Sequence, residues 1–302
     1  MKGRVILSVV FALLSVSACR NSPGKAGDYV LADSDSLSAF SSSDLMTNEE
    51  VIRSFSAPLE TANLFQVMGE PFTQEYLASS IDANRLGGSF EKALWLGILG
   101  ADLGYMNVYR KTGTSMDLLA SIKKLAEDLR VGQFFDFETI KRLSLNNSSL
   151  DSLLYLSIDS YNKIDNYLRE DNRSQLSSLM IVGAWIEAQY FATQVMKTNP
   201  DELLRDRIGE QKYFLADLIK LVEPYCDSDE QFGELCRDLR EIYSKYETVK
   251  ITYTRGEPVK SEKDGGLLIT QTETSRVEMT DQQLGEIIDK MGMVRNKLIS
   301  KN

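Results

Sequence analysis

The fold is decided by one stretch of the chain, Trp95-Leu96-Gly97-Ile98-Leu99-Gly100-Ala101-Asp102-Leu103-Gly104-Tyr105. Its small residues, Gly97, Gly100, Ala101 and Gly104, recur every three or four positions and therefore share one face of a helix. Each glycine inside a helix costs about 1 kcal/mol relative to alanine, so we expect close backbone packing to offset that cost. The pattern predicts a central helix over residues 90–111.

A second stretch, Gly183-Ala184-Trp185-Ile186-Glu187-Ala188-Gln189-Tyr190, repeats this design, with Ala184, Ala188 and Ala192 four residues apart. Both stretches are apolar nearly all round, which is typical of buried helices, so we expect the two helices to cross at close range in the core. Each bears one acid, Asp102 or Glu187.

A carboxyl group on such a helix must be paired, hydrogen-bonded or protonated. One hypothesis is that Asp102 and Glu187 meet and form a buried polar site for a cation or for a basic group of a ligand. The alternative is a structural network with an arginine or a tyrosine. Arg205, Arg207 and Glu210 of the following helix are the partners that the sequence suggests.

The rest of the body consists mainly of amphipathic helices, which predicts a mainly α fold: a multi-helix bundle or an array of helical hairpins. A short helix is expected over 72–80, and Asn199 is expected to cap a helix with Pro200 in its first turn. Alternation of apolar and polar residues from Val249 predicts a β-hairpin at about 248–279, with residues 256–266 as a polar loop. A last helix is expected over about 280–299.

The N-terminal segment has the features of an export signal. Basic Lys2 and Arg4 precede an apolar run that is shorter than the ~20 residues needed to span a bilayer, which is typical of a signal peptide. The run ends in Val16-Ser17-Ala18-Cys19, which resembles a bacterial lipobox and implies lipidation of Cys19. We therefore predict a signal peptide over 1–18, a flexible tether rich in Ser, Gly and Asp over 19–48 and a helical domain over 49–302.

Lipidated Cys19 would be the contact with the membrane. Arg20 follows it where an aspartate would imply retention in the inner membrane, which favours the outer membrane facing the periplasm. The chain has 34 Lys and Arg against 44 Asp and Glu, a net charge of −10. An acidic body lacks the basic face that nucleic-acid binding requires, so we expect an envelope protein or a small ligand as partner.

The chain contains no histidine. This excludes Ser-His-Asp and Cys-His catalysis and histidine-ligated metals. Phosphate-binding loops and nucleophile elbows are also absent from the sequence, so we predict no catalytic residue, no metal site and no cofactor. Cys226 and Cys236 are either a disulfide or two buried thiols, since Cys236 is expected about two turns into a helix that starts at Asp227 or Ser228.

Several of these features together resemble helical lipoproteins of Bacteroidetes. They are the lipobox, the Ser-rich tether, the Leu-Gly-x-x-Gly-Ala-Asp-Leu-x-Tyr helix from Leu96, the Gly-Ala-Trp-Ile-Glu helix from Gly183 and the later Glu210-Gln211-Lys212. The resemblance implies an all-helical body behind a lipid anchor, and it carries no activity and no cofactor.

The pattern as a whole favours a membrane-anchored envelope lipoprotein that binds or scaffolds rather than catalyses. One alternative is a carrier that holds a small apolar ligand between helices, which requires a sizeable apolar pocket. Another is a hydrolase based on carboxylates, which requires two of them in an open cleft.

Overall fold

The computed structural model describes residues 61–78, 85–145, 150–255, 259–263, 266–270 and 273–300. The predicted signal peptide, Cys19 and the tether lie outside the described residues. The prediction of a mainly helical fold with a β-hairpin near the C-terminal end is confirmed. The eight labelled α-helices are α2 (Ser89–Val108), α3 (Thr112–Asp128), α4 (Phe137–Leu145), α5 (Leu150–Glu170), α6 (Ser174–Thr198), α7 (Glu202–Val222), α8 (Glu230–Tyr246) and α9 (Asp281–Ser300).

The two helices of small residues, α2 and α6, form the centre of the core, and most of their residues are buried. They cross at close range because glycine lies at the contact on both sides. A Cβ atom on Gly97 would overlap the carbonyl oxygen of Met180 and lie 2.8 Å from the amide nitrogen of Ala184. A Cβ on Gly183 would overlap the carbonyl oxygen of Leu94.

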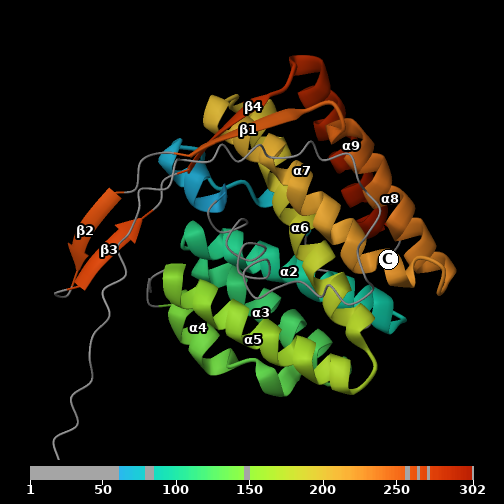
Figure 1. Ribbon diagram of the computed structural model, residues 1–302. Helices are drawn as coiled ribbons and strands as arrows, with labels where there is room; N and C mark the ends of the chain where they lie inside the picture. The colour runs from blue at the N-terminus through green and yellow to red at the C-terminus, as the bar shows by residue number, and fades with distance from the viewer. Residues whose placement is uncertain are drawn as a thin grey trace, which may run out of the picture. The chain divides into compact units, whose positions relative to one another are not determined.

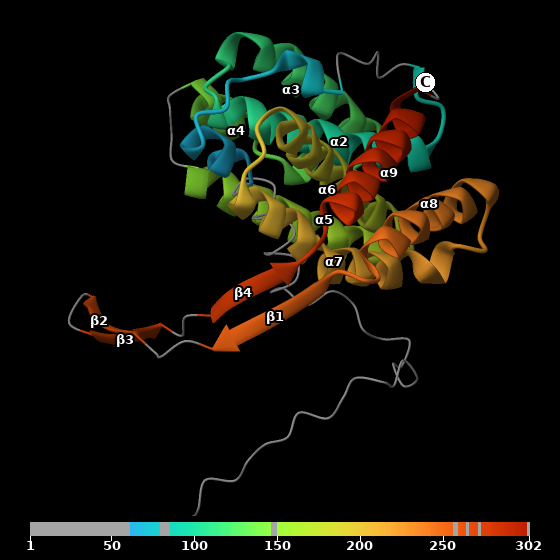
Figure 2. The ribbon, with the colours of Figure 1, turned by 90° about the horizontal axis from the view of Figure 1, so that it is seen from above.

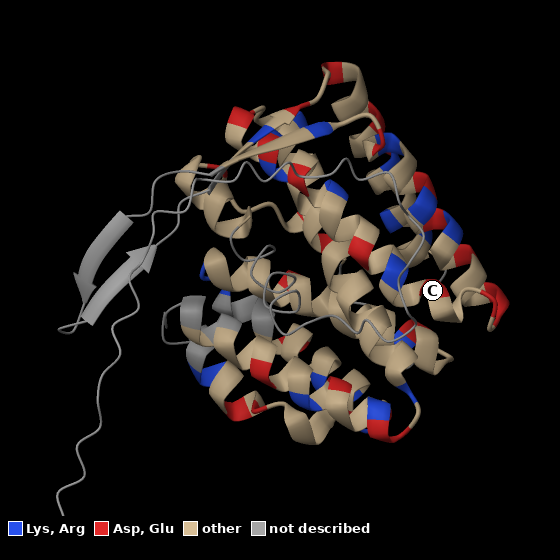
Figure 3. Cartoon of the chain, viewed as in Figure 1, with Lys and Arg blue, Asp and Glu red and all other residues tan. Residues whose placement is uncertain are grey.

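The remaining helices cover this pair in two groups. Helix α3 packs on α2, α4 bridges α3 and α5, and α5 packs on α6. The second group, α7, α8 and α9, packs on α6 through α7 and α9, and α8 joins those two. Figures 1 and 2 show the α2–α6 pair between these groups. Figure 3, in which the ribbon is coloured by residue type, shows positions of Lys and Arg interspersed with positions of Asp and Glu along α8 and α9.

The β-hairpin consists of two ladders in succession. Strand β1 (Lys250–Arg255) pairs antiparallel with β4 (Glu273–Glu278), and Ile251 lies opposite Val277. Farther along the hairpin, β2 (Val259–Lys263) pairs with β3 (Gly266–Thr270). The prediction of a loop over 256–266 is therefore wrong for 259–263 and for Gly266, which begins β3. Strand β4 packs against α7, where a Cβ on Gly209 would overlap Val277, and Figure 2 shows the β1–β4 ladder beside α7.

One predicted helix, 72–80, is reduced to a single 3₁₀ turn, η1 (Gln74–Tyr76). Asp102 accepts a hydrogen bond from the amide of Ala78, a donor that the predicted helix would direct to the carbonyl of residue 74. The amide of Thr73, which would be unpaired in the first turn of such a helix, donates to the hydroxyl of Tyr105. Both bonds attach the segment to the core.

Two helix starts and one helix end differ from prediction. Asp201, not Asn199, caps α7, and its carboxylate accepts hydrogen bonds from the amides of Leu203 and Leu204. Asp229 rather than Asp227 or Ser228 caps α8. Helix α2 ends at Val108 instead of residue 111, because Arg110 adopts a left-handed conformation with φ of 56° and closes the helix.

Candidate functional site

The structure brings Asp102 of α2 and Glu187 of α6 into one buried cluster. They are 2% and 0% exposed. Their cation is Arg295 of α9, which donates from Nε and Nη2 to the two carboxylate oxygens of Glu187 at 2.9 and 2.6 Å. The same Nη2 donates to the carbonyl of Tyr76 at 3.1 Å. The ring of Tyr190 lies 4.2 Å from the guanidinium carbon.

This cluster contains two carboxyl groups and one guanidinium, so burial of the whole is cheapest when one carboxyl is protonated. Burial and the neighbouring Glu187 charge raise the pKa of Asp102 well above its usual value. Burial also raises the pKa of Glu187, but its hydrogen bonds to Arg295 oppose this effect. We therefore assign the proton to Asp102 and the negative charge to Glu187.

The cluster connects four parts of the chain. Asp102 Oδ2 accepts from the amide of Ala78 at 3.1 Å, and Arg295 reaches Tyr76, so α2, α6, α9 and the η1 segment meet there. Both carboxyl groups are sealed in the core, which gives a hydrolase no open cleft at this pair. The arrangement matches the structural alternative, with an arginine as the partner.

The arginines that the sequence suggested lie elsewhere. Arg205 donates to Asp281 at 2.7 Å and to the carbonyl of Met279, and Arg207 pairs with Glu210. Arg295 could not be singled out from the sequence, because α9 is amphipathic and carries other basic residues. Only the packing of α9 on α6 identifies it.

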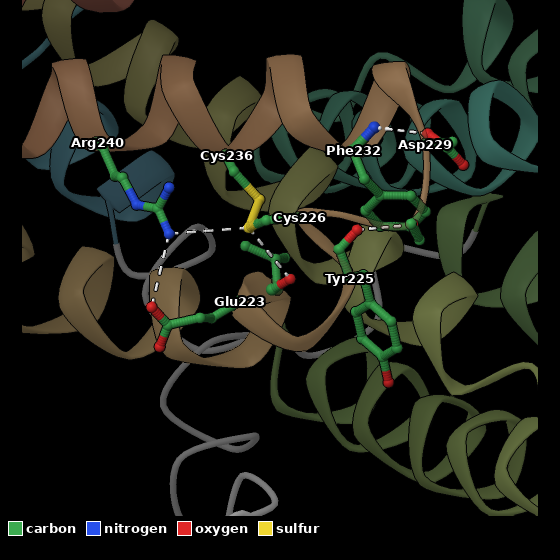
Figure 4. Close-up of a disulfide and its surroundings, with 9 residues drawn as sticks. Glu223, Tyr225, Cys226, Asp229, Phe232, Cys236 and Arg240 are labelled. Atoms are coloured by element: carbon green, nitrogen blue, oxygen red, sulfur yellow. Dashed lines mark hydrogen bonds and ion pairs between the residues drawn. A yellow bond between two sulfur atoms is a disulfide. The ribbon is translucent and has the colours of Figure 1, made fainter.

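Cys226 and Cys236 form a disulfide, with their Cα atoms 5.9 Å apart. The 3₁₀ turn η4 (Glu223–Tyr225) and the Asp229 cap fold the chain back so that Cys226 reaches a position two turns into α8 (Figure 4). Arg240 approaches Cys226 Sγ at 3.9 Å and the carboxylate of Glu223 at 3.5 Å. The bridge therefore staples the end of α7 to α8.

An apolar cavity of about 150 Å³ lies between α2, α3, α4, α5 and α6, beside the residues 132–135. Its walls carry the rings of Tyr105, Phe135, Tyr161 and Phe191 and several Leu, Ile and Met side chains. The described residues that line it include no Asp, Glu, Lys or Arg. Among them, exposed Gly100 and Ser157 mark the side that faces solvent.

The small-residue stripe of α2 therefore has two uses. Gly97 allows the close approach to α6, and Gly97, Gly100 and Gly104 all line the cavity. A Cβ on Gly100 would meet nothing within 4 Å. The sequence analysis predicted the first use and missed the second. The available signal was the length of the stripe, which exceeds what one helix crossing requires.

The described part of the chain offers neither a metal site nor a membrane-spanning helix. No group of three or more His, Cys, Asp or Glu side chains there could hold a metal ion. Within the same residues, every helix is too short or too polar to cross a bilayer. No family model, no curated protein and no solved structure matches this chain.

Proposed function

We propose that this protein is a lipid-anchored, non-enzymatic binding protein of the bacterial envelope that holds a small apolar ligand in the cavity between α2 and α5. The cavity itself carries the proposal. Protein interiors are packed to crystal-like density, and voids larger than a water molecule are few. A space of about 150 Å³ with aromatic and aliphatic walls is comparable to one that takes up benzene.

The cavity opens to solvent beside Gly100 and Ser157, so a ligand can enter from that side. The glycines at positions 100 and 104 each carry a helix-propensity cost of about 1 kcal/mol, and their lack of side chains leaves room along this wall of the cavity.

The location rests on two features of the chain. The Val16-Ser17-Ala18-Cys19 sequence supports export and acylation at Cys19. The Cys226–Cys236 disulfide is in keeping with an oxidising compartment such as the periplasm. Both support a domain tethered at the outer membrane and facing the periplasm, with the acyl chains as its attachment.

Titration calorimetry with toluene, a neutral apolar probe, tests the binding role. The full chain is used with Cys19→Ser, so that no acyl chain competes for the cavity. Toluene should bind to this protein, and Gly100→Leu, which adds a branched side chain to the cavity wall, should weaken binding at least tenfold. The matched control is Gly285→Leu on α9, since a Cβ there also meets nothing within 4 Å but lies outside the cavity.

The binding role and the lipid anchor are refuted by different results. Absence of toluene binding, or equal loss in Gly285→Leu, would refute the binding role. Membrane fractionation tests the anchor independently: protein with Cys19 should sediment with membranes, and the Cys19→Ser variant should not. Equal sedimentation of both would refute lipidation as the means of attachment.

A further inference from the structure

The polarity of the cavity wall narrows the class of ligand, given the proposed binding role. We propose that the cavity selects an electrically neutral molecule with an apolar body of about benzene size and one hydroxyl or carbonyl group, which hydrogen-bonds to Ser160. The proposal rests on the charge of the lining, on the state of its hydroxyl groups and on its volume.

Charge comes first. About a quarter of the chain, 26%, is Asp, Glu, Lys or Arg, yet none of the described lining residues is charged. An ionised carboxylate, phosphate or ammonium that entered would lose its hydration without gaining a counter-ion, which costs several kcal/mol or more. A neutral ligand escapes this cost.

The hydroxyl groups that α5 contributes to the lining differ in their hydrogen bonding. Ser157, Ser160 and Tyr161 of α5 all line the cavity. Ser157 and Tyr161 already have interaction partners. Ser160 is 4% exposed, and its hydroxyl makes no hydrogen bond to any residue that the structure describes. A serine on a helix commonly bonds the carbonyl four residues earlier, so a hydroxyl that leaves this bond unmade at an apolar wall is available to a ligand.

Size follows from the volume. A cavity of about 150 Å³ accommodates a six-membered ring with one small substituent. The four rings of the wall suit an aromatic body as well as a short alkyl one, because offset and edge-to-face contacts add to the area buried. A neutral aromatic or aliphatic alcohol is the simplest molecule that meets all three conditions.

Four probes that differ in one group test this selection by calorimetry on the full chain with Cys19→Ser: toluene, benzyl alcohol, benzoate and benzylammonium. Toluene and benzyl alcohol should bind, and the two ions should bind at least 100-fold more weakly than benzyl alcohol. Ser160→Ala should weaken benzyl alcohol about 3- to 10-fold and toluene less than 2-fold, since one neutral hydrogen bond is lost. Ser152→Ala, exposed on the same helix, is the matched control and should change neither.

The results that would refute the binding role differ from those that would refute selection for a neutral ligand. If neither toluene nor benzyl alcohol binds, the binding role itself is refuted. If toluene binds but an ion binds within tenfold of benzyl alcohol, selection for neutral ligands is refuted. If Ser160→Ala weakens toluene and benzyl alcohol equally, or neither, the assignment of Ser160 is overturned.

Discussion

Gly97 and Gly100 lie one turn apart on α2, and exchanging each for alanine is expected to change stability in opposite directions. Alanine in a helix interior is favoured over glycine by roughly 0.5–1 kcal/mol. At Gly100 nothing opposes this gain, because an added Cβ meets no atom within 4 Å. Gly100→Ala should therefore raise the free energy of unfolding by about that amount.

At Gly97 the same methyl group would overlap the carbonyl oxygen of Met180 and crowd the amide nitrogen of Ala184 at 2.8 Å. Both are backbone atoms of α6, so no side-chain rotation relieves the overlap and the helices must move apart. Overpacking of a core costs about 1–3 kcal/mol, and more where backbone must shift. After the propensity gain is subtracted, Gly97→Ala should lower stability by about 1–2 kcal/mol or more.

Urea unfolding followed by circular dichroism measures both effects, which correspond to shifts of about 2–4 °C in Tm per kcal/mol for a domain of this size. Gly183→Ala, which meets Leu94 from the opposite helix, should behave like Gly97→Ala. If Gly97→Ala proves as stable as the wild type, the close α2–α6 crossing is refuted. If Gly100→Ala is destabilising, the open space beside it is refuted.

Two further predictions concern the buried cluster and the disulfide. The raised pKa of Asp102 means that the native state keeps a proton that the unfolded state releases above about pH 4, so this group's contribution to stability falls as pH rises, by about 1.4 kcal/mol per pH unit until the native pKa is reached. Asp102→Asn should remove this slope, so its free energy of unfolding should rise relative to that of the wild type as pH rises. Glu187→Gln leaves the buried Arg295 without its charge partner and should lower the free energy of unfolding by about 3–5 kcal/mol. Parallel pH profiles of the wild type and Asp102→Asn in urea unfolding would contradict the assignment. Replacing both Cys226 and Cys236 by serine should cost about 3 kcal/mol, given their separation of 10 residues, and should make unfolding insensitive to reductant; a variant that matches the oxidised wild type would show that the bridge contributes no stability.

Local signals predicted most of the helices. Asp136 accepts a hydrogen bond from the amide of Thr139 and so caps α4, a contact between residues three positions apart. The small residues of α2 and α6 likewise predicted the central crossing. These inferences held because capping and close packing depend on residues a few positions apart.

What the sequence did not reveal depends on distant partners. A helix is predicted over 72–80, but within the described residues up to 78 the amide of Ala78 is bonded to Asp102, which lies 24 residues farther along the chain. Strand β2 carries few apolar residues and owes its conformation to its pairing with β3. The cavity exists only after five helices have assembled, and the pairing of Arg295 with Glu187 joins two helices that lie 108 residues apart in the chain.

The link between Arg295 and the core also bears on when the chain can fold. Arg295 is 108 residues from Glu187 and 219 from Tyr76, so these contacts close very long loops. While the polypeptide is being made, α2 and α6 are complete well before α9, and Glu187 has no cation to accompany it into an apolar core. Folding of the core is therefore unfavourable until α9 has been synthesised. A chain that folds late is suited to crossing a membrane unfolded, as the proposed export requires.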